Sequence, residues 1–401
     1  MNKLKREISW PLLALYGLGT ILGAGIYVLI GKVALFSGYF SPWAFLLAAL
    51  IAGFSALSYA ELSAKFPRSA GEVVYVQHAF SREFFSKLVG VLVLFTGIVS
   101  AATLVKGFVG YWNVFFPAAD GNIVIITLLL IMTSIAIKGI KETVWFTAAI
   151  SVIELFGLVY VLVNCWDLLP SPSIMFEILT PDVRWLDMKG VMLGAFVAFY
   201  AFIGFEDMVN IAEEVKEPEK SLPKAIILAL VVSVILYLLI AMVSVLILPI
   251  DTLGNSTAPF AEMLEQSSSG SALFISMISL IAVVNGVLVQ LIMCSRVIYG
   301  MADQGLAPKK LAEISPKTQT PVIATVLVSV TIGLFSLLFP LLSLAKITSF
   351  IVLCVFVMVN LSLIVIHSRT NENIYPRSIP KLGLLFSVLL ALSQIVFGSD
   401  L

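Results

Sequence analysis

Three carboxylate side chains stand inside apolar stretches of this sequence, where an acidic residue is costly. Residues 194–215 read GAFVAFYAFIGFEDMVNIAEEV, so Glu206 and Asp207 follow Gly204 closely, and Glu154 lies in another apolar stretch at 143–165. An acidic group at membrane depth needs a cavity lined by protein or water, and it marks a candidate site for a proton or a cation. We expect this role for Glu154 and Glu206. Each also has a structural alternative: a protonated Glu154 bonded to backbone, or a Glu206 that only braces its helix.

Glycines cluster in an apolar stretch near the start of the chain. Residues 17–31 read GLGTILGAGIYVLIG. Small residues let helices pack closely, and glycine also allows the backbone conformations that a helix break requires. We expect an unwound segment around Gly23, Ala24 and Gly25, and a second one beside Gly204.

The elements that position these residues are predicted to be membrane-spanning helices. Of the 401 residues, 60% are hydrophobic and 12% are charged, against roughly 25% charged in soluble proteins. A span needs roughly 20 mostly apolar residues. Eleven stretches qualify, at about 10–31, 41–64, 86–116, 122–138, 143–165, 189–212, 223–249, 270–301, 321–340, 343–367 and 379–397. The chain is therefore predicted to be an all-α polytopic membrane protein.

The segments between these spans are short. The longest exposed stretches are expected near 166–188, 213–222, 250–269 and 302–320. None is long enough for a separate soluble domain, so residues 1–401 are predicted to form a single transmembrane domain. Lys and Arg gather strongly on one side of the alternating spans, and this side is normally cytoplasmic. The prediction is an integral protein of the plasma (inner) membrane, with the N-terminus in the cytoplasm and the C-terminus outside.

The two interrupted spans occupy matching positions in the chain. Each opens a group of five helices, at about 10–165 and 189–367, and an extra helix follows at 379–397. Such matched interruptions indicate an inverted-repeat transporter with its binding site between the breaks. Freed amides at one break would hold a carboxylate, and freed carbonyls at the other an ammonium group or a cation. This pair of sites suits a zwitterion, namely an amino acid.

Four motifs make the chain resemble the amino acid–polyamine–organocation (APC) superfamily of secondary transporters, the amino acid permeases. They are Gly23-Ala24-Gly25-Ile26-Tyr27; Ser58-Tyr59-Ala60-Glu61-Leu62 with Phe66-Pro67, Ala70-Gly71-Glu72 and Tyr75; the stretch from Phe199 through Glu206 to Ile226; and Ser295 to Pro308. The match that these motifs mark spans about residues 10–325, and the remainder fits by hydropathy.

This resemblance implies a five-plus-five inverted-repeat, LeuT-like transporter core with the first and sixth helices broken at the substrate site. It implies that Gly23 belongs to the substrate-binding site and that the substrate carboxylate meets backbone amides near Ala24, Gly25 and Ile26. The ammonium group would meet the carbonyl groups of Ile21, Tyr200, Ala201 and Ile203, and Phe202 or Phe205 would gate the site.

One residue departs from the pattern of this superfamily. Many proton-coupled relatives carry a lysine in the fifth helix, where this chain has Glu154. Together with Glu206, and with no evident sodium cage, this favours proton-coupled symport, with Na⁺ as the alternative coupling ion. Exchange of internal for external substrate remains compatible with the same residues. The rivals of another class are a channel and a transport-inactive sensor with the same fold.

Several classes of function are disfavoured by composition. Two histidines and three widely spaced cysteines do not suggest a metal site, the formal net charge of zero does not suggest nucleic acid, and no catalytic motif is present. We expect no enzymatic activity and no cofactor. The expected partners are an amino acid, the coupling ion and membrane lipid, with the oligomeric state open. A lining of Ala, Ile, Phe and Tyr favours neutral or apolar amino acids, whereas an ionised Glu154 or Glu206 within reach would favour cationic ones.

Overall fold

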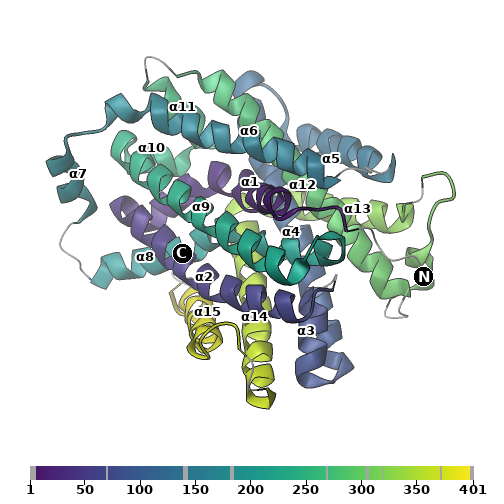
Figure 1. Cartoon of the computed structure of the whole chain (residues 1–401). Helices are drawn as coiled ribbons and strands as arrows, with labels where there is room; N and C mark the ends of the chain where they lie inside the picture. The colour runs from purple at the N-terminus through teal and green to yellow at the C-terminus, as the bar shows by residue number, and fades with distance from the viewer. Residues whose placement is uncertain are drawn as a thin grey trace.

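The structure is a computed structural model that describes residues 6–68, 71–138, 143–180, 185–267, 270–303, 307–318, 320–370 and 373–397. The described residues form helices without any strand (Figure 1). The long helices are α1 (Trp10–Ser37), α2 (Ser41–Lys65), α4 (Glu83–Phe115), α5 (Gly121–Lys138), α6 (Thr143–Asn164), α8 (Trp185–Phe199), α9 (Pro218–Ile247), α12 (Ala272–Asp303), α13 (Val322–Leu338), α14 (Leu341–Arg369) and α15 (Ser378–Phe397).

Shorter helices connect these elements. They are α3 (Gly71–Phe80), α7 (Pro172–Leu179), α10 (Ile250–Asn255) and α11 (Pro259–Glu265), together with the 3-10 helices η1 (Gly38–Phe40), η2 (Trp166–Leu168), η3 (Tyr200–Phe202), η4 (Phe205–Glu214) and η5 (Lys309–Ala312).

The helices account for the predicted membrane spans. Within the described residues, nine helical stretches are long and apolar enough to cross a membrane, and Trp10–Gly23 and Val322–Leu338 are shorter apolar helices. Helices suit this composition because each backbone amide and carbonyl in lipid must find its partner within the protein. The all-helical fold and the interruptions of the first and sixth spans confirm the predicted fold class.

One predicted exposed stretch is wrong. Residues 250–269 contain α10 and α11, and the side chains of Leu253, Phe260 and Met263 are fully buried. The segment packs against α1 and α12, and this covers its apolar side chains. The carbonyl oxygen of Leu253 lies so near Gly31 of α1 that a Cβ atom there would come within 2.1 Å of it.

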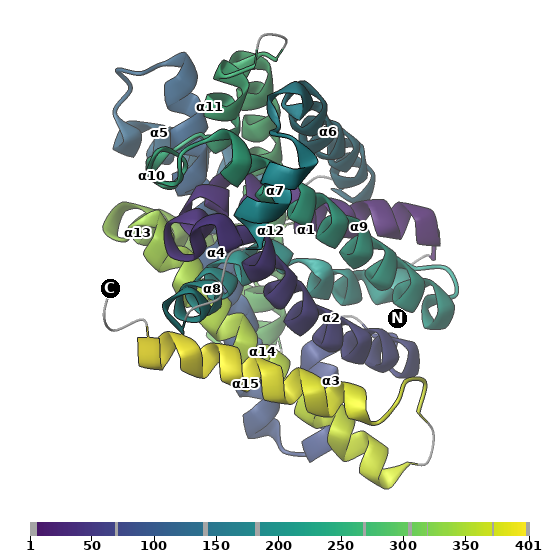
Figure 2. The same ribbon diagram turned by 90° about the vertical axis from the view of Figure 1, so that its left-hand side faces the viewer.

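Helix α1 runs through the interior of the bundle, as Figures 1 and 2 both show. It packs against α6, α8, α9 and α12. Helix α15 lies at the edge of the bundle in Figure 2, against α14, α2 and α8. The interrupted helix is therefore the one surrounded by protein, where its freed backbone groups can be satisfied.

The two ends of the broken helices are joined by backbone pairing. Ile8, just before α1, forms a parallel bridge with Val215, just after η4. The Ile8 amide donates to the Glu214 carbonyl at 3.1 Å, and the Lys216 amide donates to the Ile8 carbonyl at 2.8 Å. The first half of α1 and η4 are thus fastened together at one end.

A buried amide joins α2 to α14. Asn360 accepts a hydrogen bond from Ser58 at 2.7 Å and donates to Ser55 at 3.0 Å and to the Phe356 carbonyl at 2.8 Å. All three side chains are fully buried. Asn360 therefore holds its own helix and α2 in one register.

We predict that Asn360→Ala lowers the free energy of unfolding by about 1–3 kcal/mol, because Ser55 and Ser58 lose a buried partner. Thermal unfolding of the purified protein in detergent would measure the change. The control is Asn122→Ala, which makes the same change at an exposed position. Equal melting temperatures for the two variants would contradict the assignment.

Candidate functional site

Helix α1 is interrupted at Gly23. The backbone there has φ −17° and ψ −166°, which is not helical, although helical structure continues on both sides. The second half opens with the amides of Ala24, Gly25 and Ile26, and the first amides of a helix have no intrahelical partner. Such free amides at a helix N-terminus form a ready site for an anionic group.

The second interruption lies between η3 and η4. Gly204 has φ +132°, a conformation that other residues rarely adopt. A Cβ atom there would come within 2.3 Å of the Thr20 carbonyl oxygen. The Thr20 hydroxyl also donates to the Gly204 carbonyl at 2.9 Å. The two breaks are therefore in direct backbone contact, and glycine is required at this point.

A tyrosine from α9 spans the two breaks. The Tyr237 hydroxyl lies 2.7 Å from the Ile21 carbonyl oxygen and 3.0 Å from that of Ala201. Its ring packs on Phe202, with ring centroids 5.1 Å apart. Since each carbonyl oxygen has two lone pairs, the oxygens of Ile21 and Ala201 can each accept from a further donor.

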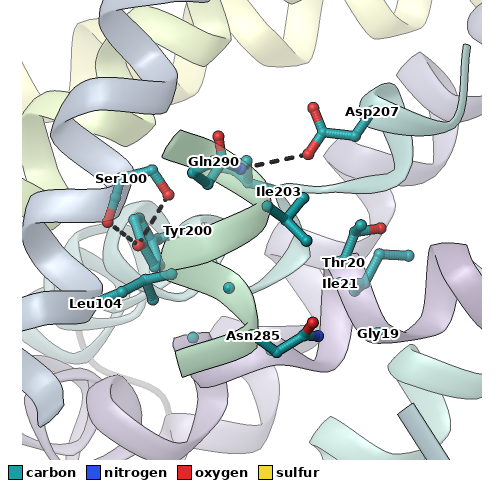
Figure 3. A pocket seen from close by; sticks show the side chains of 14 residues that line it. Gly19, Thr20, Ile21, Ser100, Leu104, Tyr200, Ile203, Asp207, Asn285 and Gln290 are labelled. Atoms are coloured by element: carbon teal, nitrogen blue, oxygen red, sulfur yellow. Dashed lines mark hydrogen bonds between the residues drawn. The ribbon is translucent and has the colours of Figure 1, made fainter. Parts of the chain in front are cut away.

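A narrow cavity of about 40 Å³ lies beside the breaks (Figure 3). It is lined by Gly19, Thr20, Ile21, Gly23, Gly25, Ser100, Leu104, Tyr200, Ile203, Asp207, Asn285, Gly286, Val289 and Gln290. Five residues predicted to bind substrate are among them: Ile21, Gly23, Gly25, Tyr200 and Ile203. Both halves of the predicted main-chain site therefore border one space.

The other predicted binding residues lie outside this lining. Ile26 is fully buried in the core, and the Ala201 backbone packs on Gly25, where a Cβ atom would be 3.0 Å from the Ala201 Cα atom. The side chain of Ala24 lies outside the part of the chain that the structure describes.

The predicted aromatic gates also lie away from the cavity lining. Phe202 packs on Tyr237 and Phe45, and Phe205 packs on Tyr59 and Phe356. The aromatic residue that lines the cavity is Tyr200. Its hydroxyl donates to the Ser100 carbonyl at 3.1 Å and lies 3.1 Å from the Ser100 hydroxyl. A gating role for Phe202 or Phe205 stays a prediction.

Polar side chains make up a wall of the cavity that the sequence did not predict. In Figure 3, Gln290 of α12 donates through Nε2 to the Asp207 carboxylate at 3.3 Å. Asn285, from the same helix, accepts from Thr147 of α6 at 3.4 Å. Amides inside an apolar span signal a protein-facing surface, so Asn285 and Gln290 were detectable. The expected lining of Ala, Ile, Phe and Tyr is too apolar for the cavity observed.

The two predicted coupling carboxylates have different surroundings. Glu206 accepts a hydrogen bond from the Gly204 amide at 2.9 Å, so it does brace the break. Glu154 is fully buried next to Asn285, yet neither carboxylate oxygen is placed to form a hydrogen bond with a described group. The Glu154 backbone carbonyl accepts from the Tyr27 hydroxyl of α1 at 2.7 Å.

A further buried carboxyl group comes from the connector α3. Glu72 is 2% exposed and accepts from the Tyr59 hydroxyl at 3.4 Å. Burial raises the pKa of Glu72 from 4.5 to about 8, and the nearby Glu206 carboxylate acts in the same direction. The group is thus held mainly in its neutral form at pH 7.

The sequence of this chain is similar to those of known membrane transporters. The family described as "Amino acid permease" matches residues 8–399. The branched-chain amino acid permease BcaP of Bacillus subtilis is 30% identical over 98% of this chain and 89% of its own length. The methylthioribose transporter of B. subtilis is 28% identical over 92% of this chain and 83% of its own length.

A plant relative is longer than this chain. Cationic amino acid transporter 3, mitochondrial, of Arabidopsis thaliana is 25% identical over 91% of this chain, and the match covers 63% of the plant protein.

We predict that Gly204→Ala destabilises the protein, by about 1–3 kcal/mol for the backbone conformation alone, with the contact on the Thr20 carbonyl adding to this. The control is Gly300→Ala in α12, where an added Cβ atom would meet nothing within 4 Å. Thermal unfolding in detergent would compare them. A G204A protein as stable as the control would show that the breaks are not tightly packed.

We also predict a pH dependence of stability from Glu72. Between pH 4.5 and about 8 the native state binds more protons at this group than the unfolded state, so its contribution to the free energy of unfolding falls as pH rises. Glu72→Gln should therefore flatten the decline of melting temperature across this window. Glu219→Gln, at an exposed position, is the control. Parallel curves for wild type and E72Q would refute the prediction.

Proposed function

The chain belongs to the amino acid permease family of membrane transporters, and we propose that it carries amino acids by alternating access in symport with protons. The observation that carries this proposal is the meeting of two interrupted helices at one cavity lined by both. Backbone groups freed at membrane depth need a partner. A zwitterion offers a carboxylate to the free amides and an ammonium group to the free carbonyls.

The substrate carboxylate is assigned to the amides of Ala24, Gly25 and Ile26, which open the second half of α1. The positive end of a helix dipole favours an anion there. The ammonium group is assigned to the carbonyls of Ile21, Tyr200, Ala201 and Ile203. The contact between the breaks, fixed by Thr20 and Gly204, supports this by holding both sets at one place.

The size of the cavity supports a cycle of opening and closing. At about 40 Å³ it has room for a few water molecules. An amino acid needs more space, so the lining must separate to admit one and close around it.

We place the protein in the plasma (inner) membrane with its N-terminus in the cytoplasm and its C-terminus outside. Residues 1–401 act as one domain, with repeats at about 10–165 and 189–367 and an extra helix at 379–397.

Proton coupling is assigned to Glu154 and Glu206. Burying an ionised carboxylate without a cation or a hydrogen-bond donor costs free energy, and this cost is smaller for the protonated group. Glu154 is fully buried and lacks a hydrogen-bond partner among the described residues. Proton release from it requires a conformation that admits water. This would tie the proton to the transport cycle.

Proteoliposomes with an imposed pH gradient test the function. A mixture of labelled amino acids is offered with and without sodium, and to empty and preloaded vesicles. Uptake into empty vesicles that needs inward protons and collapses with an ionophore supports symport. Uptake only into preloaded vesicles identifies an exchanger, conductance without counterflow a channel, and binding without flux a sensor. Accumulation that needs sodium would replace the proton by Na⁺.

We predict that Glu154→Gln and Glu206→Gln each abolish proton-driven accumulation while leaving exchange between preloaded vesicles measurable, because the amide cannot carry the proton. Glu177→Gln, at an exposed position of α7, should accumulate substrate like the wild type. If both variants keep pH-dependent accumulation, the assignment of the coupling residues is wrong.

A further inference from the structure

Asp207 places a carboxylate on the wall of the cavity. It is the acidic member of the described lining, and it is 5% exposed. In Figure 3 it projects toward Gln290, which donates to it at 3.3 Å. Glu206, the preceding residue, turns instead to the Gly204 amide. Of the two neighbouring acids, Asp207 is the one that faces the site.

No basic side chain among the described residues is paired with this carboxylate. The described lining contains no Lys, Arg or His, and no ion pair joins Asp207 to a described basic residue. The acidic side chains of Glu206 and Glu72 lie near it. An ionised carboxylate in such a place is strongly unfavourable until a cation reaches it.

A second polar group beside Asp207 also lacks a partner. The Gln290 side chain is 9% exposed, and its Oε1 atom has no hydrogen-bond partner among the described residues. Its Nε2 atom is directed at Asp207. Asn285 adds an amide to the lining, one helical turn and a half away along α12. The Gln290 Oε1 atom packs against Gly97 of α4, and the Asn285 Oδ1 atom accepts from Thr147, so the Asp207 carboxylate is the side-chain acceptor that this wall offers to a ligand.

A neutral apolar side chain would fit this wall poorly. It would leave the carboxylate buried without a cation, and sites with polar groups reject analogues that leave those groups unpaired. An ammonium or guanidinium group would supply the missing cation. Resting on the proposed transport of amino acids, we propose that Asp207, held in place by Gln290, selects amino acids with a positively charged side chain.

A purely structural role for this pair makes a different prediction. If Asp207 and Gln290 only fasten η4 to α12, substitution should weaken the fold and affect every substrate equally. Selection requires a change in the ratio between substrates. Lysine and norleucine provide this comparison, because norleucine has the same carbon chain without the terminal ammonium group.

The experiment measures uptake of labelled L-lysine and L-norleucine into proteoliposomes. The wild type is expected to prefer lysine in kcat/KM. In Asp207→Asn the ratio should fall by at least about tenfold, through loss of lysine uptake with norleucine uptake retained. Asp251→Asn, the same change at an exposed position, should keep the wild-type ratio. Gln290→Leu should lower the ratio as well, because it frees the carboxylate from its position.

The outcomes separate the two levels of the proposal. A wild type that takes up norleucine as well as lysine, or better, overturns the selectivity and leaves amino acid transport standing. An unchanged ratio in D207N overturns the role of Asp207. If D207N loses both activities, Gln290→Leu decides in the same way. Absence of uptake of lysine, norleucine and the whole amino acid mixture by the wild type would refute the proposed function itself.

Discussion

The contact between Thr20 and Gly204 is the constraint on which the rest of the site depends. The Thr20 carbonyl lies where a Cβ atom of residue 204 would be, and its hydroxyl donates to the Gly204 carbonyl at 2.9 Å. In a membrane, irregular backbone survives only where protein or a cavity lines it. By setting one break against the other, this contact supplies the surroundings that both need. The cavity and its main-chain groups follow from that arrangement.

The sequence predicts the helices and the breaks because both are local properties. Apolar runs define the spans, and Gly23 and Gly204 mark interruptions. It does not predict which side chain of a broken helix faces the cavity, because this depends on the rotation of a short non-α segment. A rotation of η4 by one residue would put Glu206 in the place of Asp207. Around η3, Tyr200 and the following Ile203 line the cavity, whereas Phe202 packs on α9. The polar wall from α12 likewise depends on helix packing.

Four buried carboxyl groups have different hydrogen-bond partners, and their roles differ accordingly. Glu206 accepts a backbone amide, Glu72 accepts a tyrosine hydroxyl, Asp207 accepts the Gln290 amide and Glu154 accepts none from a described group. The strength of these interactions determines how easily each group gives up a proton. A brace, a neutral buried acid, a cavity wall and a candidate proton carrier can therefore coexist within one bundle.

The pairing of Ile8 with Val215 has a mechanical consequence. It ties the outer end of the first half of α1 to the outer end of η4, and the inner ends of both segments stop at Gly23 and Gly204. The two segments are therefore linked at one end and interrupted at the other. Swinging one of them alone would break the backbone hydrogen bonds at Ile8 and Lys216. A movement that keeps these hydrogen bonds must turn both segments together.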